Sequence, residues 1–381
     1  MFHSVIIQQE IGKDNMRIAL IRKNYSPYGG AENYLSLIYR GLQAQGNEVH
    51  IFSADRWLGG FQGFEVRTIK KPSFLSNVSF ALNVKRILKK ESFDCILSFE
   101  RLLYQDIYRA GDGCHREWLM RRRAVEPFYK RLSFSLNPHH IILLYLERHS
   151  LLNSRIIIAN SIMVKRDIIR HYNVPQDKIH VIYNGVDLDR FRPVDAGQKN
   201  IAKDSLGIKG YKVILFVGAD FKRKGLPTLF RALSLLNMKD KRLIVAGRKE
   251  TPEYLMMAKK LGIDKDITFM GPERNIERLY KAADVFILPT IYDPFSNATL
   301  EAMASGLPVI TTRNNGASEL IENGQEGFVM DDPLNAEALA QRILVSLKDE
   351  GVMGKNARQK AENFSIEKAA IEFIEIIREL K

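Results

Sequence analysis

The chain has 381 residues, which is long enough for two domains of about 150–200 residues each rather than one ordinary core. Hydrophobic residues make up 45% and charged residues 27%, a composition that excludes disordered and fibrous proteins. The net charge of +13 lies mainly in residues 1–190, where 28 Lys and Arg outnumber 18 Asp and Glu, and this excess suits nucleic acid, an anionic membrane or a phosphorylated substrate.

The first predicted element is a strand over residues 17–23. The stretch before it lacks the basic and apolar regions of a signal peptide. Because Met16 opens the strand pattern cleanly, it is an alternative start to Met1. The two cysteines, Cys95 and Cys114, have no CxxC spacing, which argues against a zinc site and fits a reducing compartment. No apolar run reaches the roughly 20 residues that a membrane-spanning helix requires.

The rest of the first half alternates strands and helices. We expect helices at residues 31–45 and 161–172, and strands at 49–52, 95–98, 106–109 and 155–159. Residues 187–193 are typical of an interdomain connection, and residues 195–205 form a polar stretch.

The second half repeats the alternation more clearly. Strands are predicted at residues 213–217, 242–246, 267–270, 285–288 and 309–311, and helices at 227–236, 253–261, 276–283 and 296–305. Strands separated by helices of about ten residues predict parallel sheets with helices on both faces. The fold class is therefore α/β, with two doubly wound Rossmann-like domains facing across a cleft, at residues 16–190 and 195–365. An amphipathic helix within residues 366–381 could pack back on the first domain.

The strongest motif is YDPFSNATLEAMASGLPV, at residues 292–309. A strand ends before it, and a helix begins near Ser296, where unpaired backbone N–H groups attract anions. Asp293 on the turn can accept hydrogen bonds from sugar hydroxyls, and Glu301 can accept them from a ribose. Taken alone, Ser296 would more simply cap a helix and Glu301 would be solvated.

A second motif, FVGADFKRKG, occupies residues 216–225 after the first strand of the second half. Negative charge builds up on a departing diphosphate, and Arg223 and Lys224 could stabilise it. A solvated basic turn is the alternative explanation.

Two further turns lie in the first half. Gly29 and Gly30 follow the first strand, and the string YRAGDGCHREWL at residues 108–119 places Asp112 between two glycines. Glycines permit a close approach of the backbone to a ligand, although a plain turn is the commoner explanation of Gly29 and Gly30 and is the alternative for Asp112. His115 is more typical of a structural histidine.

Together and in this order, the motifs resemble those of the family 4 retaining glycosyltransferases, in particular the group that adds the first glucose to the lipopolysaccharide inner core. Asp293 and Glu301 match the two acidic residues of the family, separated by seven positions. Relatives often have Glu in place of Asp293 and Gly in place of Ser296. Many have Arg in place of Ala219, a position for which Arg223 could substitute.

The resemblance implies a GT-B fold, with the acceptor domain first and the nucleotide-sugar donor domain second. It implies a metal-independent hexosyltransferase that retains anomeric configuration and needs no cofactor beyond its nucleotide-sugar co-substrate. The implied catalytic residues are Asp112, Asp293 and Lys224. The implied donor-binding residues are Gly29, Gly30, Arg190, Arg223, Lys224, Arg248, Asp293, Ser296, Asn297, Ala298, Thr299 and Glu301. A metal site at Asp187 and Asp189 is not expected, because Lys and Arg already supply the charge for a phosphate.

The expected reaction moves a hexose from a nucleotide-diphosphate sugar to a saccharide acceptor, with UDP-glucose and the lipopolysaccharide core as the expected pair. UDP-N-acetylglucosamine, UDP-galactose and GDP-mannose remain open as donors. A nucleotide-sugar epimerase on the same fold and a basic non-catalytic binding module remain alternative functions.

The basic segment 113–148 carries seven Lys and Arg against three Asp and Glu, interleaved with aromatic and aliphatic residues. This mixture suits an anionic membrane surface, whereas a solvated helix packed on the first domain is the alternative. No signature of a nucleic-acid-binding module accompanies the charge, so nucleic acid is not expected as a partner. The expected location is cytoplasmic, at the inner face of the inner membrane.

Overall fold

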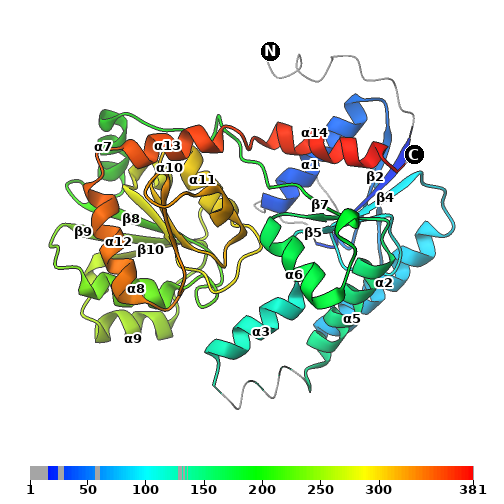
Figure 1. Ribbon diagram of the computed structural model, residues 1–381, viewed down its shortest axis with the longest axis horizontal. Coiled ribbons are helices and arrows are strands. Elements are labelled where there is room, and N and C mark those ends of the chain that lie inside the picture. Colours follow the sequence, from blue (N-terminus) through cyan, green and yellow to red (C-terminus); the bar gives the residue numbers. More distant parts are fainter. Residues whose placement is uncertain are drawn as a thin grey trace. The chain divides into compact units, whose positions relative to one another are not determined.

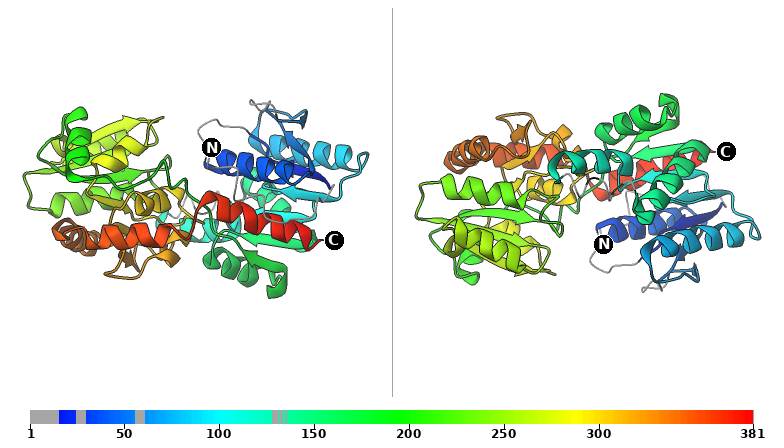
Figure 2. Two further views of the ribbon diagram at one scale, coloured as in Figure 1. Left: turned by 90° about the horizontal axis from the view of Figure 1, so that it is seen from above. Right: turned by 90° about the horizontal axis from the view of Figure 1, so that it is seen from below.

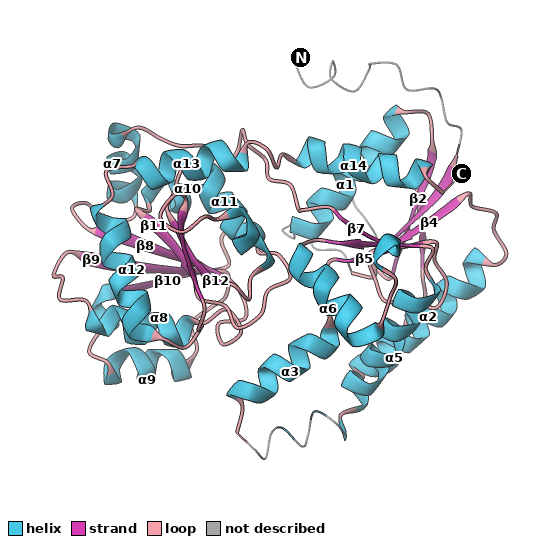
Figure 3. Cartoon of the chain, viewed as in Figure 1, coloured by secondary structure: helices cyan, strands magenta, loops and turns pink. Residues whose placement is uncertain are grey.

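The structure is a computed structural model that describes residues 16–24, 30–55, 61–127, 131, 134 and 136–380 (Figure 1). The chain forms two compact units, one of Met1–Tyr183 with Ile366–Lys381 and one of Asn184–Ser365. Each unit is a parallel sheet flanked by helices (Figure 3). None of the described helices combines the length and apolar character needed to cross a bilayer.

The first unit contains a parallel sheet in the order β3-β2-β1-β4-β5-β6-β7. Its strands are β1 (Arg17–Ile21), β2 (Glu48–Ser53), β3 (Gly63–Glu65), β4 (Cys95–Ser98), β5 (Ile107–Ala110), β6 (Ile156–Ala159) and β7 (Ile179–Val181). All four residues of β4 and of β5 are buried, as expected for strands covered on both faces.

Helices cover both faces of this sheet. They are α1 (Gly30–Ala44), α2 (Ser73–Leu88), α3 (His115–Val125), α5 (Pro138–Asn153), α6 (Ile162–Tyr172) and α14 (Ile366–Arg378). The apolar sides of α1 and α14 form one core with β1, β2 and β4, and α2 forms a second core with the other side of the same strands. A third cluster joins α6 to β5, β6 and β7.

The last helix, α14, packs against α1 although more than 300 residues separate them in the sequence (Figure 2). Phe373 stacks on Phe99 with ring centroids 6.3 Å apart. Arg155 donates a hydrogen bond to the backbone oxygen of Leu380 at 3.1 Å. The first unit is therefore completed by the end of the chain.

The second unit contains a parallel sheet in the order β10-β9-β8-β11-β12-β13. Its strands are β8 (Lys212–Val217), β9 (Lys241–Ala246), β10 (Ile267–Gly271), β11 (Val285–Leu288), β12 (Val309–Thr312) and β13 (Gly327–Met330). Its helices are α7 (Ala196–Ser205), α8 (Leu226–Leu235), α9 (Pro252–Lys260), α10 (Glu277–Ala282), α11 (Asn297–Ala304), α12 (Ala336–Lys348) and α13 (Val352–Ala361). This is the strand order of a dinucleotide-binding fold.

The polar stretch 195–205 is a helix in the structure. Asp195 caps α7 by accepting a hydrogen bond from the backbone N–H of Gln198 at 2.8 Å. Lys199 and Lys203 then pair with Asp284 at 3.4 and 2.6 Å. Because ion pairs rather than an apolar face hold α7 on the second unit, its sequence lacks the hydrophobic periodicity by which most helices are recognised.

The boundary between the units also differs from the predicted one, because residues 184–190 belong to the second unit rather than the first. The backbone N–H of Val186 donates to the oxygen of Phe364 at 2.9 Å. Asn184 donates from its side chain to Asn297 Oδ1 at 2.7 Å. These bonds attach the segment to α11 and to the end of the second unit.

Candidate functional site

The candidate site lies at the carboxyl ends of β8 and β11, which are neighbours in the second sheet. The chain reverses its direction of travel across the sheet between these two strands. In open α/β sheets ligands bind at such a reversal, outside the carboxyl ends of the strands. The loop after β8 carries the predicted basic motif, and the loop after β11 carries the predicted acidic motif.

Glycines let these loops approach one another closely. Gly225 has φ +82°, and a Cβ there would lie 1.9 Å from the backbone oxygen of Pro289. Gly247, with φ +112° after β9, leaves the same kind of space for the backbone of Gly218, which a Cβ would approach to 2.8 Å. A side chain at either glycine would push the loops apart.

The two predicted segments meet at Asp293. The Lys224 ammonium forms an ion pair with the Asp293 carboxylate, and Arg223 Nη1 lies 3.9 Å from the same carboxylate. Arg223 also donates to the backbone oxygen of Tyr292 at 3.0 Å, while its own backbone oxygen accepts from the N–H of Ile291 at 2.8 Å. Two cations and one buried carboxylate therefore share a single point of the site.

The start of α11 is held by Asn315, a fully buried residue that sequence reasoning missed. Its side chain accepts a hydrogen bond from Ser296 N at 3.1 Å and donates to Thr299 Oγ1 at 3.0 Å. Ser296 Oγ in turn accepts from Thr299 N at 3.4 Å, so Ser296 is the N-cap. The position of Asn315, three residues after β12 at the carboxyl edge of the sheet, is the signal that could have identified it.

Glu301 lies inside α11, where the hydroxyl of buried Tyr280 donates to its carboxylate at 2.8 Å. Burial raises the pKa of the Glu301 carboxyl, although the hydrogen bond from Tyr280 and the charges of Arg190 and Lys224 oppose the rise. Burial and the neighbouring Glu301 raise the pKa of Tyr280 well above its usual value, so this hydroxyl stays a donor. One carboxylate oxygen is thus oriented by the protein.

The remaining predicted residues of this unit lie around the same loops. Arg190 pairs with Glu277 at 3.0 Å and stacks over Phe191 at 5.1 Å. Asn297 is the first residue of α11, and the backbone oxygen of Ala298 lies 3.2 Å from Tyr280 Oη. Arg248 is exposed in the loop after β9.

The predicted residues of the first unit are described by themselves. Gly29 lies outside the described residues, and Gly30 is the first residue of α1. Asp112 occupies the turn between β5 and α3, and its carboxylate lies 3.7 Å from Arg101 Nη1. His115, the first residue of α3, has its pKa lowered to about 3 by burial and by the charge of Arg101. A neutral, half-buried imidazole fits the structural role predicted for it.

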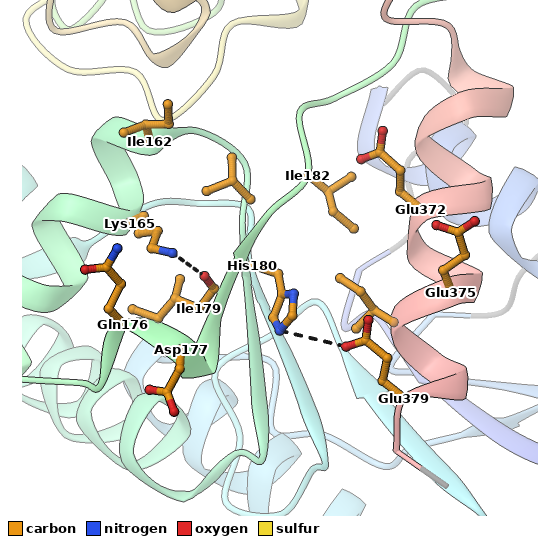
Figure 4. A pocket seen from close by; sticks show the side chains of 12 residues that line it. Ile162, Lys165, Gln176, Asp177, Ile179, His180, Ile182, Glu372, Glu375 and Glu379 are labelled. Atoms are coloured by element: carbon orange, nitrogen blue, oxygen red, sulfur yellow. Dashed lines mark hydrogen bonds and ion pairs between the residues drawn. The ribbon is translucent and has the colours of Figure 1, made fainter.

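A surface pocket of about 1030 Å³ lies elsewhere in the first unit, between α6, β7 and α14 (Figure 4). Glu372, Glu375 and Glu379 line one side, and Lys165 and Asp177 line the other. None of the predicted site residues lines it.

Among the described residues, no group of three or more His, Cys, Asp or Glu side chains is arranged to hold a metal ion. The chemistry available at the carboxyl ends of β8 and β11 is that of fixed charges, namely the two cations of the basic loop and the N–H groups at the start of α11. Such a set suits a bound anion. The adjacent carboxylates suit hydroxyl groups next to that anion.

Comparison with protein families gives two matches that together span most of the chain. The family described as "Glycosyltransferase Family 4" matches residues 28–190, and the family described as "Glycosyl transferases group 1" matches residues 198–365. These matches confirm the family that the motifs resemble.

Two relatives align over nearly the full length. A Methanocaldococcus jannaschii protein described as "Uncharacterized glycosyltransferase MJ1607" is 27% identical over 354 residues, covering 88% of this chain and 90% of its own. The Escherichia coli lipopolysaccharide glucosyltransferase WaaG is 24% identical over 359 residues, covering 91% and 94%.

Solved structures agree on the fold. The crystal structure of WaaG matches with a TM-score of 0.82 at 23% identity, covering 94% of this chain and 99% of that one. Anabaena HepE, solved in complex with UDP-glucose, matches with a TM-score of 0.73 at 19% identity, covering 96% and 100%. The predicted fold class of two Rossmann-like domains of GT-B type is confirmed.

Proposed function

We propose that this chain, which belongs to glycosyltransferase family 4, transfers glucose from UDP-glucose to a saccharide acceptor of the lipopolysaccharide core. The observation that carries the proposal is the contact between the Lys224 loop and the turn of Asp293 at the start of α11. Cations, a helix start and a buried carboxylate meet there within one unit. The names of WaaG and of the HepE complex support the choice of donor and acceptor.

In the proposed reaction Lys224 and Arg223 bind the diphosphate. Negative charge grows on the diphosphate as the bond to the sugar breaks, so these cations stabilise the transition state more than the ground state. In the structure Lys224 is paired with Asp293. A bound diphosphate would take over the ammonium and release the Asp293 carboxylate to accept hydrogen bonds from the sugar hydroxyls.

The start of α11 supplies the second half of the proposed donor site. The backbone N–H groups of Asn297 and Ala298, in the first turn of α11, are proposed to bind the phosphates, and Glu301, oriented by Tyr280, to accept from the ribose. Arg190 and Arg248 are proposed to flank the nucleotide, and Gly29, Gly30 and Asp112 to contribute from the acceptor domain. With fixed cations at the diphosphate, the reaction proceeds without a metal, so a chelator should leave the rate unchanged.

The acceptor is proposed to be reached at an anionic membrane surface on the cytoplasmic side of the inner membrane. Within segment 113–148 the side chains of Met120, Leu136, Ile141 and Tyr145 are 53%, 78%, 52% and 62% exposed. Arg116, Arg131 and Arg148 are exposed in the same segment. Exposed apolar and basic side chains together favour an anionic lipid interface.

A donor screen by thermal shift tests the proposal. A ligand at about 100 times its Kd stabilises the folded state by about 2.7 kcal/mol, which is readily measured. We expect UDP-glucose to raise Tm more than UDP-galactose, UDP-N-acetylglucosamine, GDP-mannose or ADP-glucose. If no nucleotide sugar and no nucleoside diphosphate changed Tm, the donor site would be wrong.

A transfer assay then separates the possible reactions. Purified protein is mixed with UDP-glucose and with lipopolysaccharide truncated before its first hexose, and UDP release and the product mass are measured. Glucose addition supports the proposal. An isomerised nucleotide sugar formed without acceptor would instead identify an epimerase.

A further inference from the structure

The turn that carries Asp112 has an elaborate set of supports. Residues 111–114 connect β5 to α3, and Gly113 adopts φ +71°. The backbone oxygen of Gly111 accepts from Asn160 Nδ2 at 2.9 Å, and that of Gly113 accepts from Arg101 Nη2 at 3.1 Å. Asp112 itself has a side chain that is 58% exposed. An exposed carboxylate on a firmly held backbone is suited to meeting a ligand in a set geometry.

The support converges on Glu147, a residue of α5 that is 1% exposed. Its carboxylate accepts from five donors, which are Arg101 Nε at 3.2 Å, His115 N at 2.6 Å, Arg116 N at 3.2 Å, Tyr172 Oη at 2.5 Å and Cys114 Sγ at 3.9 Å. A buried carboxylate is costly unless its acceptor sites are filled, and here they are filled from two helices, α3 and α6, and from the loops of Arg101 and Cys114.

Two of these donors are the first backbone N–H groups of α3. The N-cap residue of this helix, Cys114, makes no side-chain capping bond. Glu147, 32 positions away from His115, therefore performs the capping that a local Ser or Asp usually performs. The helix start, and with it the end of the Asp112 turn, is fixed by α5.

Arg101 connects the same carboxylate to the exposed one. Its guanidinium donates to Glu147 from Nε and to the Gly113 oxygen from Nη2, and its Nη1 lies 3.7 Å from Asp112. A planar guanidinium cannot rotate one of these groups without moving the others. The bond from Arg101 to Glu147 therefore fixes where the Arg101 charge lies relative to the Asp112 carboxylate.

We propose that Glu147 is a positioning residue for the sugar transfer: through Arg101 and the start of α3 it holds the turn that presents Asp112. This inference rests on the proposed function of Asp112. It adds a residue that no motif contains and assigns it an effect on turnover rather than on donor affinity, because the side chains proposed to bind the diphosphate and the ribose belong to the second unit.

The test uses Glu147→Gln with Glu117→Gln as the matched control. Glu117 belongs to α3, is 5% exposed, and binds Arg121, Arg170 and His171. Both substitutions remove one buried charge that anchors α3, but only Glu147 connects to Arg101. In the UDP-glucose assay with truncated lipopolysaccharide, we expect kcat to fall at least tenfold for Glu147→Gln with the KM for UDP-glucose within twofold. For Glu117→Gln we expect kcat within twofold.

A double variant shows whether the effect passes through Asp112. If it does, adding Glu147→Gln to Asp112→Asn lowers kcat by less than twofold beyond Asp112→Asn alone. Multiplicative losses would overturn the proposal, and so would equal losses of kcat in Glu147→Gln and Glu117→Gln. Wild-type kcat in Asp112→Asn would instead refute the proposed function of Asp112.

Hydrogen exchange of the unsubstituted protein keeps the inference testable should Glu147→Gln fail to fold. First-turn amides have no acceptor within their own helix and ordinarily exchange rapidly. We expect the amides of His115 and Arg116 to be protected at least tenfold more than the first-turn amides of α2, whose N-cap makes no side-chain bond. Equal exchange would overturn the proposed hold on the turn.

Discussion

The turn after β11 and the turn after β5 each present an aspartate at the end of a parallel strand, but they are held differently. Asp293 has a side chain that is 7% exposed, and its partners Arg223 and Lys224 come from another recognisable motif. Asp112 is 58% exposed, and its turn is held by Arg101 and Glu147, which belong to no motif. Sequence patterns therefore reveal residues that share a chemistry, whereas the buried residues that position them remain hidden.

The largest effect should come from the turn of Asp293, whose partner Lys224 belongs to a motif that the sequence reveals. We expect Lys224→Ala to lower kcat by about 100- to 1,000-fold, because one group that stabilises a developing charge typically contributes that much. The measurement is UDP release from UDP-glucose with truncated lipopolysaccharide. Lys260→Ala, on the exposed end of α9, serves as the control for charge and folding. Unchanged turnover in folded Lys224→Ala would end the assignment of the diphosphate site.

The surfaces of the two units should also differ in their affinity for lipid. Changing Arg116, Arg131 and Arg148 together to Gln removes three exposed cations, each contributing about 1 kcal/mol near an anionic leaflet, so binding should weaken about 100-fold. Sedimentation with phosphatidylglycerol vesicles measures it. The control changes Lys209, Lys239 and Lys259 of the second unit, three exposed cations, in the same way. Equal losses for both triple variants would argue against a membrane face at segment 113–148.

In the second unit, too, a buried residue outside the motifs supports the site, because Asn315 holds the start of α11. In this respect the turn of Asp293 resembles the turn of Asp112. Asn315→Ala leaves the buried N–H of Ser296 without its acceptor, and we expect it to destabilise the protein by about 2 kcal/mol, roughly a 30-fold change in the unfolding equilibrium. Urea unfolding measures this loss, with exposed Asn363→Ala as the control. A loss equal to that of the control would show that the start of α11 does not depend on Asn315.

The smallest effect should be a shift of pH dependence at Glu301. Burial raises the pKa of this carboxyl, so donor binding that needs the ionised form is complete above that pKa and is lost as the pH falls through it. The hydrogen bond from Tyr280 lowers the same pKa. Tyr280→Phe should therefore move the acidic limb of kcat/KM to higher pH and weaken donor binding about five-fold, since such a bond contributes about 1 kcal/mol. An unmoved limb would exclude Glu301 as its origin.

Much of the fold could be predicted because buried parallel strands are short apolar runs between helices. The bounds of β4 and β11 agree with the prediction, at Cys95–Ser98 and Val285–Leu288. Helix α5 escaped prediction because its apolar and polar residues, PHHIILLYLERHSLLN, show almost no sidedness. Strands β3 and β7 escaped because three residues carry too little pattern, and β13 begins with Gly327, a residue type that is depleted in strands.

By itself the sequence determined the strand–turn–helix order, the excess of positive charge in the first half, and the two loops proposed to bind the donor, because each depends on residues that are neighbours in the chain. Only the tertiary structure decided where the units divide and that Glu147 and Asn315 hold the two turns. These outcomes depend on hydrogen bonds and packing between residues far apart in the chain. A buried polar residue has no role until folding brings its partners to it.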